Sequence, residues 1–226
     1  RIENANGKWI LSFGMESESQ TRELTDKTMG IDLGVKDLAI AEFDGQQLTF
    51  HNINKSKTIR ALKRKQKHLQ RTISRKYEAN RIGKRFVKTK NIEKCEAQLR
   101  RIYARLTNIR QNYIHQTTHT LVEYLPKRIV MEDLNVQGMM KNKHLSKAIQ
   151  EQCFHEFIRQ IEYKSEDRGI EFIQADRFYP SSKTCSHCGS VKTDLKLKDR
   201  TYVCDECGLV IDRDYNAAVN LSRYVA

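Results

Sequence analysis

The fold of this chain is decided by one stretch, Met29-Gly30-Ile31-Asp32-Leu33-Gly34-Val35-Lys36-Asp37-Leu38-Ala39-Ile40-Ala41. Its two apolar runs, separated by a glycine, predict a β-strand, a tight turn and a second strand. Asp32 lies in the middle of the first run. A buried strand rarely tolerates a lone carboxylate, because desolvating an unpaired charge is costly. We therefore expect a cationic group to meet Asp32.

Two other carboxylates occur in comparable places. Glu132 ends the apolar run of residues 128–132, and Asp214 opens a predicted short helix within residues 212–218. Carboxylates from three separated elements can converge on Mg²⁺, which prefers oxygen ligands. Each acid also has a purely structural interpretation: Asp32 as a turn cap, Glu132 as a strand-end ion pair and Asp214 as a helix N-cap.

Apolar patterns place further elements along the chain. We expect strands at residues 29–35, 38–43, 47–53, 127–132 and 170–175, and helices at 146–168 and about 214–224. Asp44-Gly45 is a turn signal between the second and third strands. Three strands, a helical segment, strand, helix, strand, small module and final helix, in that order, predict an α/β fold of the RNase H type interrupted by two insertions.

Positive charge is concentrated in one segment. The chain has 226 residues and a formal net charge of +13. Residues 55–90 contain 15 Lys/Arg and one acid, Glu78, for a net +14, while the rest of the chain sums to −1. A nucleic-acid partner is therefore expected, with a solvated basic surface or an anionic membrane surface as alternatives. No apolar run approaches the ~20 residues that span a bilayer, so we expect no membrane segment.

The basic segment also has helical periodicity. Its first apolar stripe comprises Ile59, Leu62, Leu69 and Ile73, and a second, heptad-spaced stripe comprises Ile92, Cys95, Leu99, Ile102, Leu106, Ile109 and Tyr113. With a break near residues 80–83, these stripes predict an antiparallel coiled-coil hairpin from about residue 56 to 124. Its first arm is predicted to bind phosphates; a merely solvated charged helix is the alternative. The proposed phosphate-binding residues are Arg60, Lys63, Lys67 and Arg71.

Four of the six cysteines form two pairs with the spacing C-x₂-C-x₁₅-C-x₂-C. The pairs are Cys185/Cys188 and Cys204/Cys207, each followed by a glycine. The spacing predicts a structural zinc ribbon, in which four thiolates fill a tetrahedral site and leave no position open for catalysis. Because no secretion signal is visible, metal is favoured over disulfides, and a redox dithiol is the alternative. We expect His187 to be exposed, and Cys95 and Cys153 to pack among apolar residues of helical stripes.

The N-terminal residues predict the end of a β-hairpin. Asn6-Gly7 is a two-residue turn signal, and apolar and polar residues alternate from Trp9 to Met15. The chain has no initiator Met. We expect a fragment cut inside a β-domain whose larger part lies upstream, followed by a polar linker at residues 16–27.

Several motifs follow one another along the chain: Gly30-Ile31-Asp32-Leu33-Gly34, Val130-Met131-Glu132-Asp133-Leu134-Asn135, Arg177-Phe178-Tyr179-Pro180-Ser181-Ser182-Lys183-Thr184-Cys185, the two cysteine pairs and Asp212-Arg213-Asp214-Tyr215-Asn216-Ala217-Ala218. In this order they resemble the TnpB family, the OrfB proteins of bacterial insertion sequences, which are related to compact type V CRISPR nucleases. The resemblance covers about residues 27–221.

The resemblance implies the RuvC half of an RNA-guided DNA endonuclease, with guide RNA and target DNA as partners, in a bacterial or archaeal cytoplasm. It maps the catalytic triad onto Asp32, Glu132 and Asp214, with Asp212 less favoured for the third position. From the resemblance we also expect that the family's N-terminal recognition region is missing from this chain. The implied parts are the end of a wedge-type β-barrel (1–19), three RuvC parts (26–54, 126–177 and 211–226), the basic helical hairpin (55–125) and a zinc ribbon matching the target-nucleic-acid-binding domain (178–210).

The implied chemistry is two-metal phosphodiester hydrolysis. Two Mg²⁺ ions held by the triad would activate a water and stabilise the leaving 3′ oxygen, with Asp32 bridging both ions, and one Zn²⁺ would be structural. Without Mg²⁺, repulsion predicts a raised pKa for at least one of the three carboxylates. Two alternatives are a nuclease-inactive guided DNA-binding repressor, which loss of a triad acid would mark, and a transposase that joins DNA strands.

Overall fold

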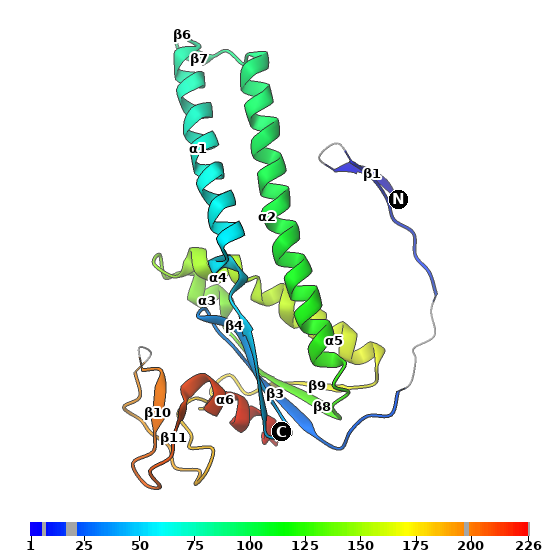
Figure 1. Cartoon of the computed structure of the whole chain (residues 1–226), viewed down its shortest axis with the longest axis vertical. Helices are drawn as coiled ribbons and strands as arrows, with labels where there is room; N and C mark the ends of the chain where they lie inside the picture. Colours follow the sequence, from blue (N-terminus) through cyan, green and yellow to red (C-terminus); the bar gives the residue numbers. More distant parts are fainter. Residues whose placement is uncertain (6–7, 17–21, 197–198, 226) are drawn as a thin grey trace. The chain divides into compact units, whose positions relative to one another are not determined.

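The computed structural model describes residues 1–5, 8–16, 22–196 and 199–225 (Figure 1). By its internal contacts the chain forms two compact units. The first combines Arg1–Glu18 with Ile53–Tyr113, and the second combines Ser19–Asn52 with Ile114–Ala226. The predicted turn at Asn6-Gly7 and part of the predicted linker lie outside the described residues.

The first unit contains a short hairpin and most of two long helices. β1 (Ile2–Ala5) pairs antiparallel with β2 (Lys8–Leu11), which confirms the predicted strands. α1 (Lys57–Ala79) and α2 (Lys90–Val122) are joined by residues 80–89. α2 continues into the second unit. No described helix is long and apolar enough to cross a membrane. The remaining short elements are the 3₁₀ turn η1 (Ile53–Lys55), β6 (Arg81–Ile82) and β7 (Arg85–Phe86).

Apolar stripes hold the two long helices together. Ile59 and Leu69 of α1 belong to one buried cluster with Ile102 and Leu106 of α2. These side chains were predicted to face a partner helix, because apolar residues spaced three and four apart form a continuous stripe. α1 begins where the Ser56 hydroxyl accepts a hydrogen bond from the Ile59 N–H at 3.3 Å. The predicted helical hairpin is confirmed.

The second unit is built on a mixed sheet with the strand order β5-β4-β3-β8-β9. The strands are β3 (Thr28–Leu33), β4 (Asp37–Phe43), β5 (Gln46–His51), β8 (Arg128–Glu132) and β9 (Glu171–Ala175). β3, β4 and β5 form an antiparallel meander, whereas β8 pairs parallel with both β3 and β9. The five strands expected from the sequence are therefore confirmed.

The helices of the second unit follow the prediction with one correction. The helix expected at residues 146–168 is divided at Cys153, whose φ of 55° lies in the left-handed region. A left-handed residue cannot continue a right-handed helix, so Cys153 ends one helix and begins another and does not sit on a helical stripe. These helices are α3 (Val136–Met140), which was not predicted, α4 (Ser146–Gln152), α5 (Phe154–Asp167) and α6 (Arg213–Ser222).

A small module lies between β9 and α6 in the sequence. Its strands β10 (Thr201–Val203) and β11 (Val210–Asp212) pair antiparallel. Tyr202 of β10 is fully buried and packs with Cys185 and Cys204. The core of the module is therefore the cysteine cluster itself, because so short a segment has few other apolar groups to bury.

Candidate functional site

Asp32 and Glu132 lie on neighbouring strands. Ile31 of β3 is the register partner of Met131 of β8, and these strands run parallel. Asp32 and Glu132 are the next residues on each strand, so their side chains leave the sheet on the same face. The strands expected to carry Asp32 and Glu132 are therefore neighbours in the sheet.

Asp214 lies on helix α6, which packs against strand β3. A Cβ added to Gly30 of β3 would lie 2.0 Å from the carbonyl oxygen of Ala218 and 2.3 Å from the backbone nitrogen of Ser222. The backbones of β3 and α6 therefore touch, an approach that only glycine permits. This contact fixes α6, with Asp214 in its first turn, against the strand that carries Asp32.

The N-cap of α6 is Asp212. Its side chain accepts hydrogen bonds from the N–H groups of Asp214 at 3.0 Å and Tyr215 at 3.1 Å. The interpretation of Asp214 as the cap is therefore wrong, because the capping residue precedes the first helical turn. The buried carboxylate of Asp214 instead forms ion pairs with Arg213 and Arg200.

The three carboxylates repel one another. Burial raises the pKa of Asp32 well above its ordinary value, and the charges of Glu132 and Asp214 raise it further. Burial also raises the pKa of Glu132, and Asp214 adds to this effect. Crowded, desolvated carboxylates favour their neutral forms. The pKa increase was expected from repulsion, whereas burial is its larger cause.

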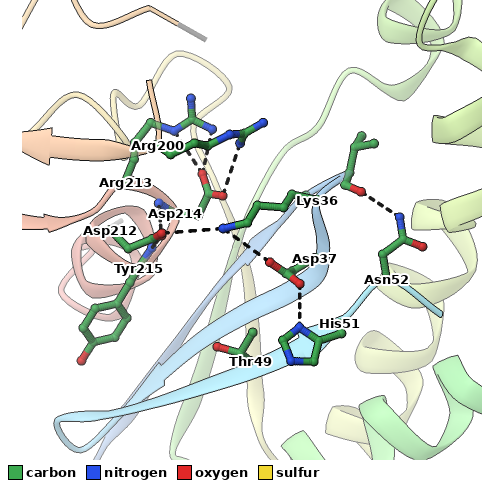
Figure 2. Close-up of polar contacts among 12 residues, drawn as sticks. Lys36, Asp37, Thr49, His51, Asn52, Arg200, Asp212, Arg213, Asp214 and Tyr215 are labelled. Atoms are coloured by element: carbon green, nitrogen blue, oxygen red, sulfur yellow. Dashed lines mark hydrogen bonds and ion pairs between the residues drawn. The ribbon is translucent and has the colours of Figure 1, made fainter. Parts of the chain in front are cut away.

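Arginines partly offset this negative charge. Arg213 contacts one Asp214 oxygen through Nη2 at 2.7 Å and Nε at 3.0 Å, and Arg200 Nη1 lies 3.7 Å from the other oxygen (Figure 2). The charge of Arg213 also opposes the pKa increases of Asp32 and Glu132. The cation expected near Asp32 is therefore Arg213, which hydrogen-bonds Asp214.

A second group of charges adjoins this site. Lys36 Nζ, in the turn between β3 and β4, lies 3.9 Å from Asp37 and 4.0 Å from Asp212 (Figure 2). His51 Nδ1 of β5 lies 2.8 Å from the other Asp37 oxygen. These contacts join the β3–β4 turn to the N-terminus of α6.

Ser181 connects Glu132 to the small module. Its buried hydroxyl donates a hydrogen bond to the Glu132 carboxylate, which works against the raised pKa of Glu132. Asn220 of α6 donates to the carbonyl oxygens of Ser181 and Thr184, each at 2.7 Å. Helix α6 therefore holds residues 181–184, which contact Glu132 through Ser181 and lead into the first cysteine pair.

Three residues of this site were not predicted from the sequence. Arg213 lies between two candidate acids, and Ser181 lies in a motif that carried the family resemblance, so both had a detectable signal. Arg200 had none, because only the fold of the small module brings it to Asp214.

The donor set fits a hard divalent cation. The three carboxylates are buried or half-buried, and carboxylate oxygens are the ligands that such cations prefer. Among the described residues, two arginines, Arg200 and Arg213, form ion pairs with Asp214, so the three acids exceed these nearby positive charges. Within the described ranges, the three carboxylates do not all lie within 4.8 Å of one another, whereas the four paired cysteines do. A single ion held by all three carboxylates would therefore require them to move closer together.

The cysteine cluster has the dimensions of a tetrahedral metal site. The Sγ atoms of Cys185 and Cys207 are 3.6 Å apart, as are those of Cys188 and Cys204. Zinc–sulfur bonds of about 2.3 Å in a tetrahedron separate the sulfur atoms by about 3.8 Å, so these residues fit Zn²⁺. His187 is exposed, as predicted.

The surroundings of Cys204 favour its thiolate form. Gly189 and Gly208 have φ values of 78° and 72°, where the chain turns tightly after each cysteine pair as expected. A hydrogen bond from the Ser190 hydroxyl, at 3.1 Å, lowers the pKa of Cys204 to about 6. A metal binds the thiolate form, so this contact prepares Cys204 as a ligand.

The predicted phosphate-binding residues lie on α1. Arg60, Lys67 and Arg71 are exposed, and Lys63 is half-buried. Their spacing of three or four residues places them on one side of the helix. Their role in binding stays a prediction.

Two family models match the chain. Residues 12–143 match OrfB_IS605, described as "Probable transposase". Residues 154–221 match the family described as "Cas12f1-like, TNB domain". The first match contains Asp32 and Glu132, and the second contains Asp214 and the cysteine cluster.

Individual relatives agree with these matches. A Streptomyces pristinaespiralis protein named "Putative RNA-guided DNA endonuclease" is 33% identical over 215 residues, which cover 95% of this chain and 49% of that protein. The Escherichia coli (strain K12) protein "Putative RNA-guided DNA endonuclease InsQ" is 29% identical over 236 residues, with 97% and 54% covered. The chain thus spans about half the length of these curated relatives.

The fold also matches a solved structure, "Cryo-EM structure of the Cas12f1-sgRNA-target DNA complex", with a TM-score of 0.61 and 17% identity. The match covers 98% of this chain and 55% of that chain. At this identity the likeness concerns the α/β fold alone. The resemblance predicted from the motifs is confirmed by the sequence matches. The OrfB_IS605 model matches more than half of the residues of this chain. The chain therefore belongs to the OrfB_IS605 family, which includes the TnpB proteins.

Proposed function

We propose that the chain carries the nuclease site of an RNA-guided DNA endonuclease. One observation supports this most: Asp32, Glu132 and Asp214 approach one another from β3, β8 and α6, and burial, with added repulsion between the acids, raises the pKa of the first two. Buried like charges are costly, so their assembly points to a cation-dependent role. The names of the relatives support the same class of activity.

In this proposal the mixed sheet with its helices is an RNase H-like RuvC fold. An antiparallel meander continued by two parallel strands supports that assignment. The fold would be assembled from residues 26–54, 126–177 and 211–226, with the helical hairpin at 55–125 and a zinc ribbon at 178–210 as insertions and residues 1–19 as the end of a wedge-type β-barrel.

Each carboxylate has its own support. Asp32 lies on β3, between β4 and β8, and interacts with both other acids, so it suits the bridging position. Ser181 orients Glu132, and Arg213 orients Asp214. Two Mg²⁺ ions bound by these acids would supply an activated water and stabilise the leaving 3′ oxygen.

The same proposal includes one structural Zn²⁺ at the cysteine cluster. Four thiolate ligands complete a tetrahedral shell, so the zinc holds the module together and takes no part in cleavage. Guide RNA and target DNA would bind through their phosphates to the cationic face of α1. That face comprises Arg60, Lys63, Lys67 and Arg71.

Guided cleavage tests the proposal. The protein is assembled with its guide RNA and incubated with matched target DNA in Mg²⁺ or in EDTA. Asp32→Ala should lower the cleavage rate by orders of magnitude and leave target affinity unchanged, because affinity comes from phosphate contacts elsewhere. Glu162→Gln, which changes an exposed acid of α5, should cut like the parent. Equal cleavage by Asp32→Ala, or cleavage in EDTA, would contradict the two-metal assignment.

The same assay separates the other functions. Tight binding of matched DNA by the unmutated protein without any cleavage would identify a guided repressor. Covalent joining of transposon ends to a second DNA would identify a transposase. Free 3′-hydroxyl ends at the cut site, with no joined product, would identify the endonuclease.

A further inference from the structure

Phe178 is an exposed aromatic residue beside the carboxylate site. Its side chain is 87% exposed. It lies in the turn at residues 176–181, which leads from β9 to the first cysteine pair. A single exposed apolar side chain is ordinary on a protein surface, so its position and rigidity decide its meaning.

The turn that carries Phe178 is held firmly on both sides. The Phe178 N–H donates to Asp176 Oδ1 at 2.8 Å, and the Tyr179 N–H donates to the Asp176 carbonyl oxygen at 2.9 Å. The ring of Tyr179 packs edge-on against Tyr224, with centroids 4.9 Å apart, and its hydroxyl donates to the Asn220 carbonyl oxygen at 3.2 Å. The neighbour of Phe178 is thus packed inward while Phe178 points into solvent.

The same turn is tied to the residues at the end of β8. Arg177 Nη2 lies 2.6 Å from Asp133, which follows Glu132 in the sequence. Ser181, at the other end of the turn, hydrogen-bonds Glu132 itself. Phe178 therefore lies between Arg177 and Ser181 in the sequence, and both of these residues contact the end of β8. That strand carries the proposed catalytic acid Glu132.

We infer that Phe178 is a stacking platform for an unpaired base of the DNA strand that enters the carboxylate site. The inference rests on the proposed function and names how its substrate is held. An aromatic face binds any base by stacking, which suits a strand cut irrespective of its sequence. The half-exposed guanidinium of Arg177, oriented by Asp133, lies next to the platform in the sequence and offers charge to the adjoining phosphate.

Binding of single-stranded DNA by the 226-residue chain tests this inference. The probe is a 12-nucleotide oligothymidylate containing one 2-aminopurine, whose fluorescence falls when its base stacks, in buffer without Mg²⁺. Phe178→Ala should weaken binding between about 5-fold and about 150-fold and abolish the quenching. Phe178→Trp should retain both, and Val210→Ala, which removes an exposed apolar side chain elsewhere in the module, should match the parent.

The salt dependence and one further variant separate stacking from charge attraction and from general apolar contact. Phe178 carries no charge, so Phe178→Ala should lower affinity at every salt concentration without changing the slope of log K against log salt. Phe178→Leu should bind as weakly as Phe178→Ala. If Phe178→Leu or Phe178→Ala binds and quenches like the parent, or if the parent does not quench the probe, the inference is overturned. Failure of the proposed function is recognised separately, by undiminished cleavage with Asp32→Ala.

Discussion

The hydroxyl of Ser181 donates a hydrogen bond to the carboxylate of Glu132, and this contact links strand β8 to the segment entering the cysteine cluster. Asn220 of α6 holds the backbone of the same serine. A carboxylate that ligates a metal is oriented by such partners. The small module and the carboxylate site are thus coupled through Ser181, in addition to the contact between Arg200 and Asp214.

Ser181→Ala should therefore weaken Mg²⁺ binding without unfolding the protein. Loss of a hydrogen-bond partner behind a metal ligand typically costs ~10–100-fold in metal affinity. The measurement is the Mg²⁺ concentration that gives half-maximal cleavage of guided DNA. Ser182→Ala, at the neighbouring position, is the control. An unchanged Mg²⁺ requirement for Ser181→Ala would show that the hydrogen bond has no part in ligand positioning.

Gly30→Ala should destabilise the second unit strongly. The new Cβ would lie 2.0 Å from the Ala218 carbonyl oxygen, so α6 must move away from β3. Overpacking of this kind costs about 1–3 kcal/mol or more in the free energy of unfolding. Urea denaturation measures the change. Gly14→Ala is the control, because no atom lies within 4 Å of its added Cβ, and it should unfold like the parent.

Asp32→Asn should stabilise the protein in buffer without Mg²⁺ at neutral pH. The pKa of Asp32 is raised in the folded state by burial and then by Glu132 and Asp214. The stability this gives is present below the ordinary pKa and is lost as pH rises through the raised value. Asn carries no charge and does not undergo that loss of stability. The melting temperature of Asp32→Asn should therefore exceed that of the parent by an amount that increases with pH.

Two controls accompany this prediction. Adding Mg²⁺ should shrink the advantage of Asp32→Asn, because an ion that compensates the carboxylates stabilises only the parent. Glu162→Gln should show no such pH-dependent gain. Equal melting temperatures for Asp32→Asn and the parent between pH 4 and pH 8 would mean that the site is not electrostatically strained.

The cysteine cluster should bind about one Zn²⁺ per chain. Cys185→Ser removes one of four ligands, and metal binding and folding are coupled in such sites. We expect loss of zinc in metal analysis and rapid proteolysis within residues 178–210. Cys95→Ser, outside the cluster, should keep its zinc. Zinc-free protein after purification without chelator would refute the metal assignment.

Replacing Arg60, Lys63, Lys67 and Arg71 with Gln should weaken binding of all nucleic-acid sequences alike. Each lost contact to a duplex phosphate should reduce the salt slope of log K by about 0.9. The comparison is a variant with equal charge loss on the other helix, in which Gln replaces Lys90, Lys94, Arg101 and Arg105. Identical slopes for the two variants would indicate a general charge effect and no defined face on α1.

Local chemistry let the sequence predict most elements and the candidate acids. The apolar runs around Asp32 and Glu132 specified buried strands, because burial on both faces requires continuous apolar residues. The spacing of Cys185, Cys188, Cys204 and Cys207 specified the cluster, because the ligand geometry of a tetrahedral site constrains the loops between its pairs. Repetition at three and four residues specified the two long helices.

Tertiary structure alone decided how these parts meet. The break at Cys153, whose φ is 55°, has no local sequence signal such as proline or glycine. Arg200 reaches Asp214 only because the module folds back on α6. Asp212 is the N-cap of α6, and Asp214 lies in the first turn of that helix. Such contacts join residues distant in sequence, and their energies depend on burial and orientation that periodicity and spacing do not encode.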